Sequence, residues 1–189
     1  MRDYIIRAAF HEHVLKQAHE AEDTIVVNEL GLRHGEIRAD IAVLNGKMIG
    51  YEIKTDKDTL TRLENQVIAY NEVFSEAYVI TGERHLAKVL EKIPEWWGIY
   101  LIGGQEDSVT FHRYRRAGHN ERRTGYSIAQ LLWKQEISYI LQSGFDCFIK
   151  PSYTRHKMYE MLAERCDINK ISELVIDKLK QRQNWRTNL

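Results

Sequence analysis

The sequence predicts an α/β fold in which a mixed β-sheet is flanked by helices and followed by an all-α C-terminal region. Up to about residue 115, β-branched and apolar runs alternate with stretches of helical spacing. The dipeptide Asn45-Gly46 joins two of the β-prone runs and is a strong hairpin signal. From Tyr126 onward, the apolar residues recur at helical spacing. We therefore expect a core (1–115), a basic linker (116–125) and a helical region (126–189).

The elements of the core are predicted from local patterns, taken in chain order. A charged amphipathic stretch predicts a first helix over residues 3–21. β-branched runs bounded by turn residues predict strands over 24–32, 37–44 and 47–55. Helical spacing predicts the next helix over 59–74, with Asp58 as its N-cap. Downstream we expect a strand over 77–81, a helix over 84–92 that ends before Pro94, and strands over 97–102 and 108–114.

The turns between the first three strands decide which side chains share a face. A two-residue loop at Asn45-Gly46 would set Asp40 opposite Tyr51, whereas a three-residue loop places Asp40 and Glu52 on one face. We predict the three-residue loop, a type I turn with Gly46 in the left-handed region. A two-residue link at His34-Gly35 would place Glu29 directly across from Asp40.

Asp40, Glu52 and Lys54 together suit a metal-assisted reaction on a phosphodiester. Hard divalent cations prefer carboxylate oxygens, and a lysine ammonium can neutralise charge on a phosphate. The alternative is a surface hairpin with solvated charges. Because the apolar residues Ala42, Leu44 and Met48 are expected on the same face, charges there are costly unless they are paired or metal-bound, which favours the metal site.

These residues resemble the PD-(D/E)XK nuclease superfamily, whose restriction-endonuclease-like core is a helix, three antiparallel strands, a helix and a further strand (αβββαβ). In that family an Asp begins the second strand and a Glu-x-Lys lies on the third, matching Asp40, Glu52 and Lys54. Arg38-Ala39 replaces the Pro of the motif. Gln66-Val-Ile-Ala-Tyr70 matches the Gln-x-x-x-Tyr element of RecB-like branches, although plain helix amphipathicity would also explain it.

The resemblance implies a Mg²⁺- or Mn²⁺-dependent nuclease that hydrolyses nucleic acid, with DNA as the expected substrate. Asp40 and Glu52 would be metal ligands, with the backbone carbonyl of Ile53 completing the metal shell, and Lys54 would be the catalytic lysine. Glu29 would be a further metal-binding or water-positioning carboxylate, with Glu12 as its rival. Gln66 would be a positioning residue, and Tyr70 would contact a phosphate or a base.

A basic segment interrupts a chain whose formal net charge is zero. Between His112 and Arg123, five arginines stand against one glutamate, a local net charge of +4. This segment could follow a phosphate backbone, or it could be a solvated loop between domains. The nucleic-acid-binding candidates are Arg113, Arg115, Arg116, Arg122 and Arg123.

Two other classes of function remain open at this point. One is a binding module that keeps the nuclease fold without catalysis, and the other is a small α/β protein whose match to the motif is accidental. No long apolar run and no secretory signal are present, so we expect a cytoplasmic protein without a membrane partner. A homodimer is an option if both strands of a duplex are cut. The helical region could serve as a nucleic-acid clamp, a lid or a dimerisation element.

Overall fold

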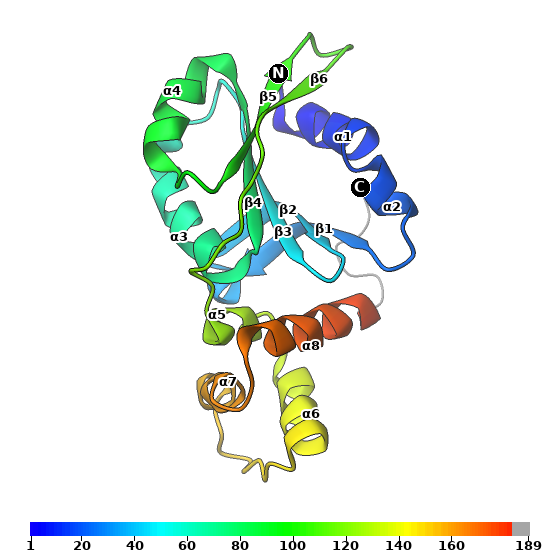
Figure 1. Ribbon diagram of the computed structural model, residues 1–189, viewed down its shortest axis with the longest axis vertical. Helices are drawn as coiled ribbons and strands as arrows, with labels where there is room; N and C mark the ends of the chain where they lie inside the picture. Colours follow the sequence, from blue (N-terminus) through cyan, green and yellow to red (C-terminus); the bar gives the residue numbers. More distant parts are fainter. Residues whose placement is uncertain (183–189) are drawn as a thin grey trace.

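A mixed sheet with the strand order β1-β2-β3-β4-β5-β6 organises the computed structural model, which describes residues 1–182 (Figure 1). The first three strands form an antiparallel meander: β1 (Ile25–Leu32), β2 (Ile37–Leu44) and β3 (Met48–Lys54). β4 (Glu76–Gly82) and β5 (Gly98–Gly103) continue the sheet in parallel with β3, and β6 (Thr110–Arg115) closes it antiparallel to β5. The predicted α/β class is confirmed.

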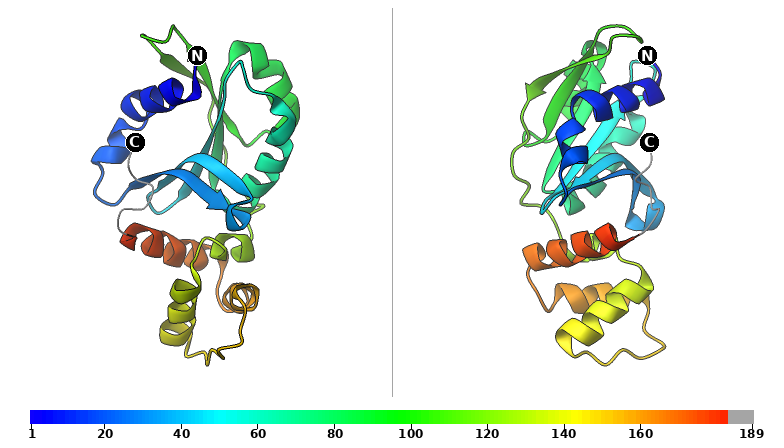
Figure 2. Two further views of the ribbon diagram at one scale, coloured as in Figure 1. Left: turned by 180° about the vertical axis from the view of Figure 1, so that it is seen from behind. Right: turned by 90° about the vertical axis from the view of Figure 1, so that its right-hand side faces the viewer.

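Helices cover both faces of the sheet (Figure 2). α1 (Asp3–His13) and α2 (Lys16–Glu20) pack on one face, where Ile6 and Phe10 share an apolar cluster with Ile41 of β2. α3 (Leu63–Val73) and α4 (Glu83–Lys92) pack on the other face, where Val67 joins the cluster of Ala42 and Leu44. Alternate residues of each strand therefore enter separate apolar layers.

The single N-terminal helix predicted over 3–21 is wrong, because the chain breaks between α1 and α2. At the break, Leu15 is buried in the cluster that contains Phe10. The change of direction also brings His19 to His11, with 2.8 Å between Nε2 and Nδ1. The burial of Leu15 and the pairing of the two imidazoles are tertiary contacts. The helical spacing of apolar residues in the sequence does not reveal them.

The predicted register of the meander is confirmed. Ile41 lies opposite Tyr51 and Leu44 opposite Met48, so the loop consists of residues 45–47, and Gly46 has a φ of +83°. Glu29 of β1 lies across from Asp40 of β2, because the pairs on either side of them are Asn28–Ile41 and Leu30–Ala39. At the hairpin tip, within the short 3₁₀ segment η1 (Arg33–Gly35), His34 and Gly35 have φ values of +59° and +96°, as in a type I′ turn.

The expected N-cap at Asp58 is wrong. Its carboxylate accepts hydrogen bonds from the backbone N–H of Thr55 at 2.8 Å and from the Thr55 hydroxyl at 2.7 Å. Because Thr55 uses this carboxylate, Asp58 closes the turn after β3. The chain then forms a short 3₁₀ segment, η2 (Leu60–Arg62), before α3 begins at Leu63.

The C-terminal part is helical, as predicted, and lies beneath one end of the sheet (Figure 1). It consists, within the described residues, of α5 (Gly125–Ala129), α6 (Lys134–Phe145), α7 (Arg155–Ala163) and α8 (Ile168–Gln181). Its apolar residues, Leu141 and Val175 among them, belong to the same cluster as Val67 and Leu30 of the core. Residues 183–189 of the predicted helical region lie outside the described residues. None of the helices in residues 1–182 has the length and apolar character needed to cross a lipid bilayer.

Gly50 tests the packing of β3 against α3. A Cβ at Gly50 would lie 2.5 Å from Cδ2 of the fully buried Phe74. We predict that Gly50→Ala lowers the free energy of unfolding by about 1–3 kcal/mol, the usual cost of overpacking. Urea unfolding measures the change. Gly144→Ala is the matched control, since it adds a Cβ to open space on α6 and should be neutral or stabilising. Equal effects of the two substitutions would contradict the packing.

Candidate active site

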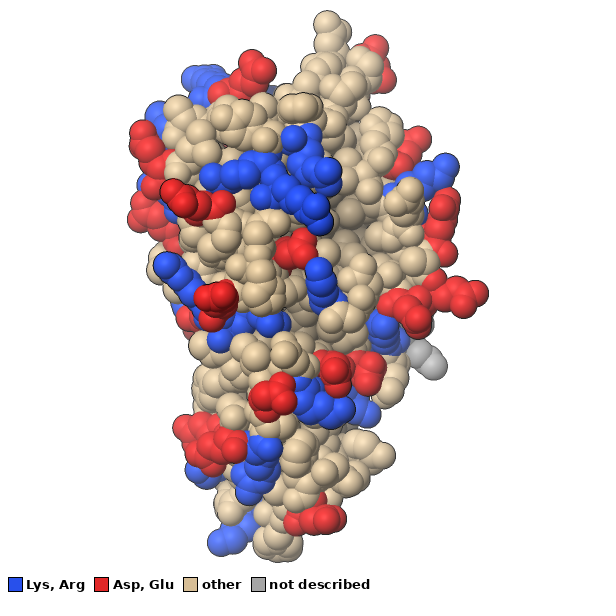
Figure 3. Space-filling view, in the orientation of Figure 1, with Lys and Arg blue, Asp and Glu red and all other residues tan. Residues whose placement is uncertain are grey.

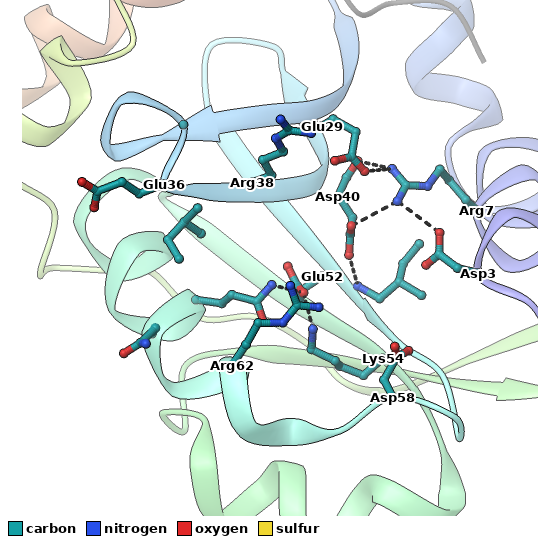
Figure 4. Close-up of a pocket in the computed structure, with 15 residues that line it drawn as sticks. Asp3, Arg7, Glu29, Glu36, Arg38, Asp40, Glu52, Lys54, Asp58 and Arg62 are labelled. Carbon is teal, nitrogen blue, oxygen red and sulfur yellow. Dashed lines mark hydrogen bonds and ion pairs between the residues drawn. The ribbon is translucent and has the colours of Figure 1, made fainter.

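A pocket of about 550 Å³ opens beside the meander, between α1 and the start of α3 (Figure 4). α1 contributes Asp3 and Arg7, and the curled β1–β2 hairpin contributes Glu29, Arg38 and Asp40. The end of β3 and the chain that follows it contribute Glu52, Ile53, Lys54, Asp58, Arg62 and Gln66. The structure therefore brings Glu29, Asp40, Glu52, Ile53, Lys54 and Gln66 of the predicted site into one pocket.

Glu52 is buried in the wall of this pocket, with 1% of its surface exposed. One carboxylate oxygen, Oε1, accepts a hydrogen bond from Lys54 Nζ at 2.6 Å and another from the Gln66 side-chain amide. The other oxygen, Oε2, accepts from the Tyr70 hydroxyl at 2.7 Å. Burial raises the pKa of Glu52, although Lys54 and the hydrogen bonds act in the opposite direction.

Asp40 faces the same pocket from β2. Its Oδ2 accepts a hydrogen bond from the backbone N–H of Ile53 at 2.7 Å, and its Oδ1 lies 3.1 Å from Arg7 Nη2. Burial and then the charge of Glu52 raise the pKa of Asp40 to about 7, against the lowering effects of the Ile53 N–H and Arg7. A buried carboxylate and a half-buried one, both with raised pKa values, form a region that favours an added cation.

Arg7 was not predicted from the sequence, and it is the main cation on the α1 side of the pocket (Figure 4). Its guanidinium lies 2.8 Å from Glu29, 3.1 Å from Asp40 and 3.2 Å from Asp3, and it also donates to the backbone carbonyl of Asp40 at 2.8 Å. Burial opposes its charge, but the three carboxylates outweigh burial and raise the pKa of Arg7. The i,i+4 spacing of Asp3 and Arg7 was the only sequence signal for Arg7. This spacing predicts an ion pair within α1 but not the contact of Arg7 with Asp40 on β2.

Glu29 reaches the pocket, whereas Glu12, its rival, is not among the residues that line it. Glu29 has a φ of +55°, which is unusual for a residue with a side chain. Its carboxylate is directed at Arg7, whose guanidinium contacts both Glu29 and Asp40 from the α1 side (Figure 4). Within residues 1–182, no three His, Cys, Asp or Glu side chains are gathered closely enough to hold a metal by themselves.

Gln66 and Tyr70 share a face of α3, but they play different roles. Gln66 lines the pocket, and its buried Oε1 has no hydrogen-bond partner in the described part of the chain. Tyr70 is fully buried, and its hydroxyl contacts Glu52 and the backbone carbonyl of Tyr51. The expected contact of Tyr70 with nucleic acid is therefore wrong, because its side chain is not accessible and instead supports Glu52.

The arginines of the basic segment do not line this pocket. Arg115 donates to the backbone carbonyls of Trp97 and Pro94, and Arg123 contacts Ser172 and Asn169 of α8, so these two have structural partners. Three others are exposed: Arg113, Arg116 and Arg122. The face seen in Figure 3 carries a group of Lys and Arg side chains in its upper half. β6 lies at the opposite edge of the sheet from β1, so this segment is a separate surface.

Two exposed arginines at the pocket were missed by the sequence analysis. Arg38 comes from β2, and Arg62 comes from η2 before α3 (Figure 4). Neither forms an ion pair within residues 1–182. The sequence signal for Arg38 was its position two residues before Asp40, where Arg38-Ala39 replaces the Pro of the PD-(D/E)XK motif. Free cations beside buried carboxylates suit an anionic ligand that meets both.

Comparison with known proteins gives the family. The family described as Bacteriophage P4 protein cII matches residues 1–188. The chain belongs to this family. Protein cII of Enterobacteria phage P4 is 26% identical over 189 residues, which is 100% of this chain and 70% of that protein. A solved structure of a protein of unknown function from Silicibacter pomeroyi has a TM-score of 0.41 and 14% identity, covering 74% of this chain and 92% of the other.

The raised pKa of Asp40 predicts a pH dependence of stability. The folded protein holds the Asp40 proton up to about pH 7, whereas an unfolded Asp loses its proton near pH 4. The folded state therefore binds more protons between these values, and stability falls as the pH rises through this window, by up to about 4 kcal/mol. Asp40→Asn should flatten this decline when unfolding is measured in EDTA from pH 4 to 8. Asp23→Asn, at an exposed position, should retain it; an unchanged decline in Asp40→Asn would refute the assignment.

Proposed function

We propose that this protein is a metal-dependent phosphodiesterase that hydrolyses nucleic acid, with DNA as the expected substrate. One observation carries the proposal: the buried carboxylate of Glu52 and the half-buried carboxylate of Asp40 lie on neighbouring strands and line one pocket, and Lys54 contacts Glu52. Carboxylates are rarely buried at such density unless they are paired or bind a cation. The order of elements supports the relationship to the PD-(D/E)XK superfamily, because α1 with α2, the β1–β3 meander, α3 and β4 follow one another, which is the order αβββαβ when α1 and α2 are counted as one broken helix.

The donor set fits a hard divalent cation such as Mg²⁺ or Mn²⁺. Asp40 and Glu52 would hold it, with the backbone carbonyl of Ile53 as a further oxygen donor, whereas Glu29, which is directed at Arg7, would position water. The buried Gln66 Oε1, which has no partner in residues 1–182, supports the fit because an oxygen in such a place needs a donor or a cation. When bound, the cation would polarise the phosphodiester and lower the pKa of a water nucleophile.

The remaining residues of the pocket would stabilise charge, orient Glu52 or bind neighbouring phosphates. Lys54, held by Glu52 at 2.6 Å, would stabilise negative charge on the phosphate. Gln66 and Tyr70 orient the Glu52 carboxylate through hydrogen bonds to its two oxygens. Arg38 and Arg62 would bind phosphates of the strand on either side of the reacting one. The exposed arginines of the basic segment would add weaker contacts if the nucleic acid is long.

A second candidate is a nucleic-acid-binding module that does not cleave. The observation in its favour is that both carboxylates already have cationic partners, Arg7 at Asp40 and Lys54 at Glu52. In this case Arg7 would hold Asp40 permanently and replace the metal. The two candidates differ in whether Mg²⁺ or Mn²⁺ produces hydrolysis that depends on Glu52.

Cleavage assays on single-stranded, duplex and branched DNA and on RNA, with Mg²⁺ or Mn²⁺, test the proposal. We predict that Glu52→Gln and Lys54→Met each lower the rate by about 100-fold or more, because the first removes a charged ligand and the second removes the cation at the phosphate. Glu64→Gln and Lys92→Met are matched controls, since this ion pair joins α3 to α4 outside the pocket. Retained cleavage in both pocket variants, with folding checked by circular dichroism, would refute the proposed site.

A further inference from the structure

A second pocket, of about 220 Å³, lies between the tip of the β1–β2 hairpin and the helical region. From the hairpin it is lined by Gly31, His34 and Gly35. From the helical region it is lined by Trp133 at the start of α6, by Arg155 at the start of α7 and by Arg182 after α8. The proposed function does not use this pocket.

The second pocket is cationic, in a chain whose net charge is zero. No carboxylate is among its lining residues in the part of the chain that the structure describes. Arg182 is balanced by Glu136, which its Nε contacts at 2.8 Å. Arg155 is exposed and forms no ion pair among residues 1–182. A guanidinium in this position is suited to an anion, and a phosphate matches its planar donor pattern.

The second pocket also offers an aromatic surface. Trp133 is 53% exposed, although it stands in a wall of the pocket. The guanidinium of Arg182 lies over one face of its ring, 4.0 Å from the centroid. An exposed indole beside a free arginine is the combination that binds a base and its phosphate in single strands.

The two pockets meet at Gly35, which lines both. Gly35 has a φ of +96°, and a Cβ added there would meet no heavy atom within 4 Å. Gly35 therefore places no side chain of its own between the two pockets at this point of the hairpin. The second pocket is smaller than typical sites for whole small molecules, which measure roughly 300–1,000 Å³. It suits one unit of a chain-like ligand that continues into the first pocket.

We propose that the second pocket binds a nucleotide of the same polynucleotide strand whose phosphodiester lies in the first pocket. Arg155 binds its phosphate, Trp133 stacks on its base, and the strand crosses the hairpin at Gly35. This inference rests on the proposed function, because it takes the ligand of the first pocket to be a nucleic acid. It makes single-stranded polynucleotide, or a single-stranded extension of a duplex, the preferred substrate.

Fluorescence anisotropy of the full chain with a labelled single-stranded DNA oligonucleotide, in EDTA so that no hydrolysis is involved, tests the inference. We expect Arg155→Gln and Trp133→Leu each to weaken binding by about tenfold, the scale of one stacked base or one strong charged contact. Arg155→Gln should also reduce the dependence of affinity on salt, whereas Trp133→Leu should not. Arg84→Gln is the matched control, an exposed arginine of α4 outside both pockets and outside the basic segment. An RNA of the same sequence reports whether the sugar matters.

The outcomes separate this inference from the proposed function. Binding that is absent in the wild type, unchanged in Arg155→Gln and Trp133→Leu, or weakened equally by Arg84→Gln would overturn the second pocket. If these variants bind normally while cleavage still requires Glu52, only the second pocket falls. If they bind weakly while no cleavage is found, the second pocket stands, and the protein is a binding module.

Discussion

The burial of Glu52 is the constraint around which the rest of the structure is arranged. A carboxylate that is 1% exposed is costly unless donors replace its water, and here Lys54, Gln66 and Tyr70 do so. Gln66 and Tyr70 both come from α3, so satisfying Glu52 fixes how this helix sits on β3. The ring of Tyr70 then packs against Phe74 and Trp97, which joins the polar contact to the apolar core. Loss of one partner of such a buried pair typically costs about 3–5 kcal/mol.

The charge of Asp40 is balanced by a different kind of partner from that of Glu52. Its cationic partner, Arg7, comes from α1 on the opposite face of the sheet and is shared with Glu29 and Asp3. A shared arginine neutralises Asp40 only in part, and the pKa of Asp40 stays raised. A divalent cation entering the pocket would compete with Arg7 for the same oxygens. The structure thus combines a carboxylate held by side chains of α3 with one whose cationic partner is shared with two other carboxylates.

The sequence was sufficient where the determining interactions are local. Asn45-Gly46 located the β2–β3 hairpin, although this dipeptide alone favours a two-residue turn. The three-residue loop was predicted because it places Asp40 and Glu52 on one face, and the strand register confirms it. The break after α1 was missed because it depends on the burial of Leu15 against a strand distant in sequence. Arg7, Arg38 and Arg62 were missed for a related reason: the sequence does not say which exposed-looking arginines the fold will bring to one pocket. The burial of Tyr70, which excludes it from contact with substrate, likewise follows from tertiary packing.

The most direct test of the central claim is a titration of the full chain with Mn²⁺, followed by calorimetry or electron paramagnetic resonance at pH 6 and pH 8. We predict about one bound Mn²⁺ per chain, with tighter binding at pH 8 because the carboxylate ligands must lose their protons. Binding should be lost in Asp40→Asn and Glu52→Gln and kept in Glu64→Gln. Absence of binding to the wild type, or equal binding by all three variants, would contradict the claim that Asp40 and Glu52 form a metal site.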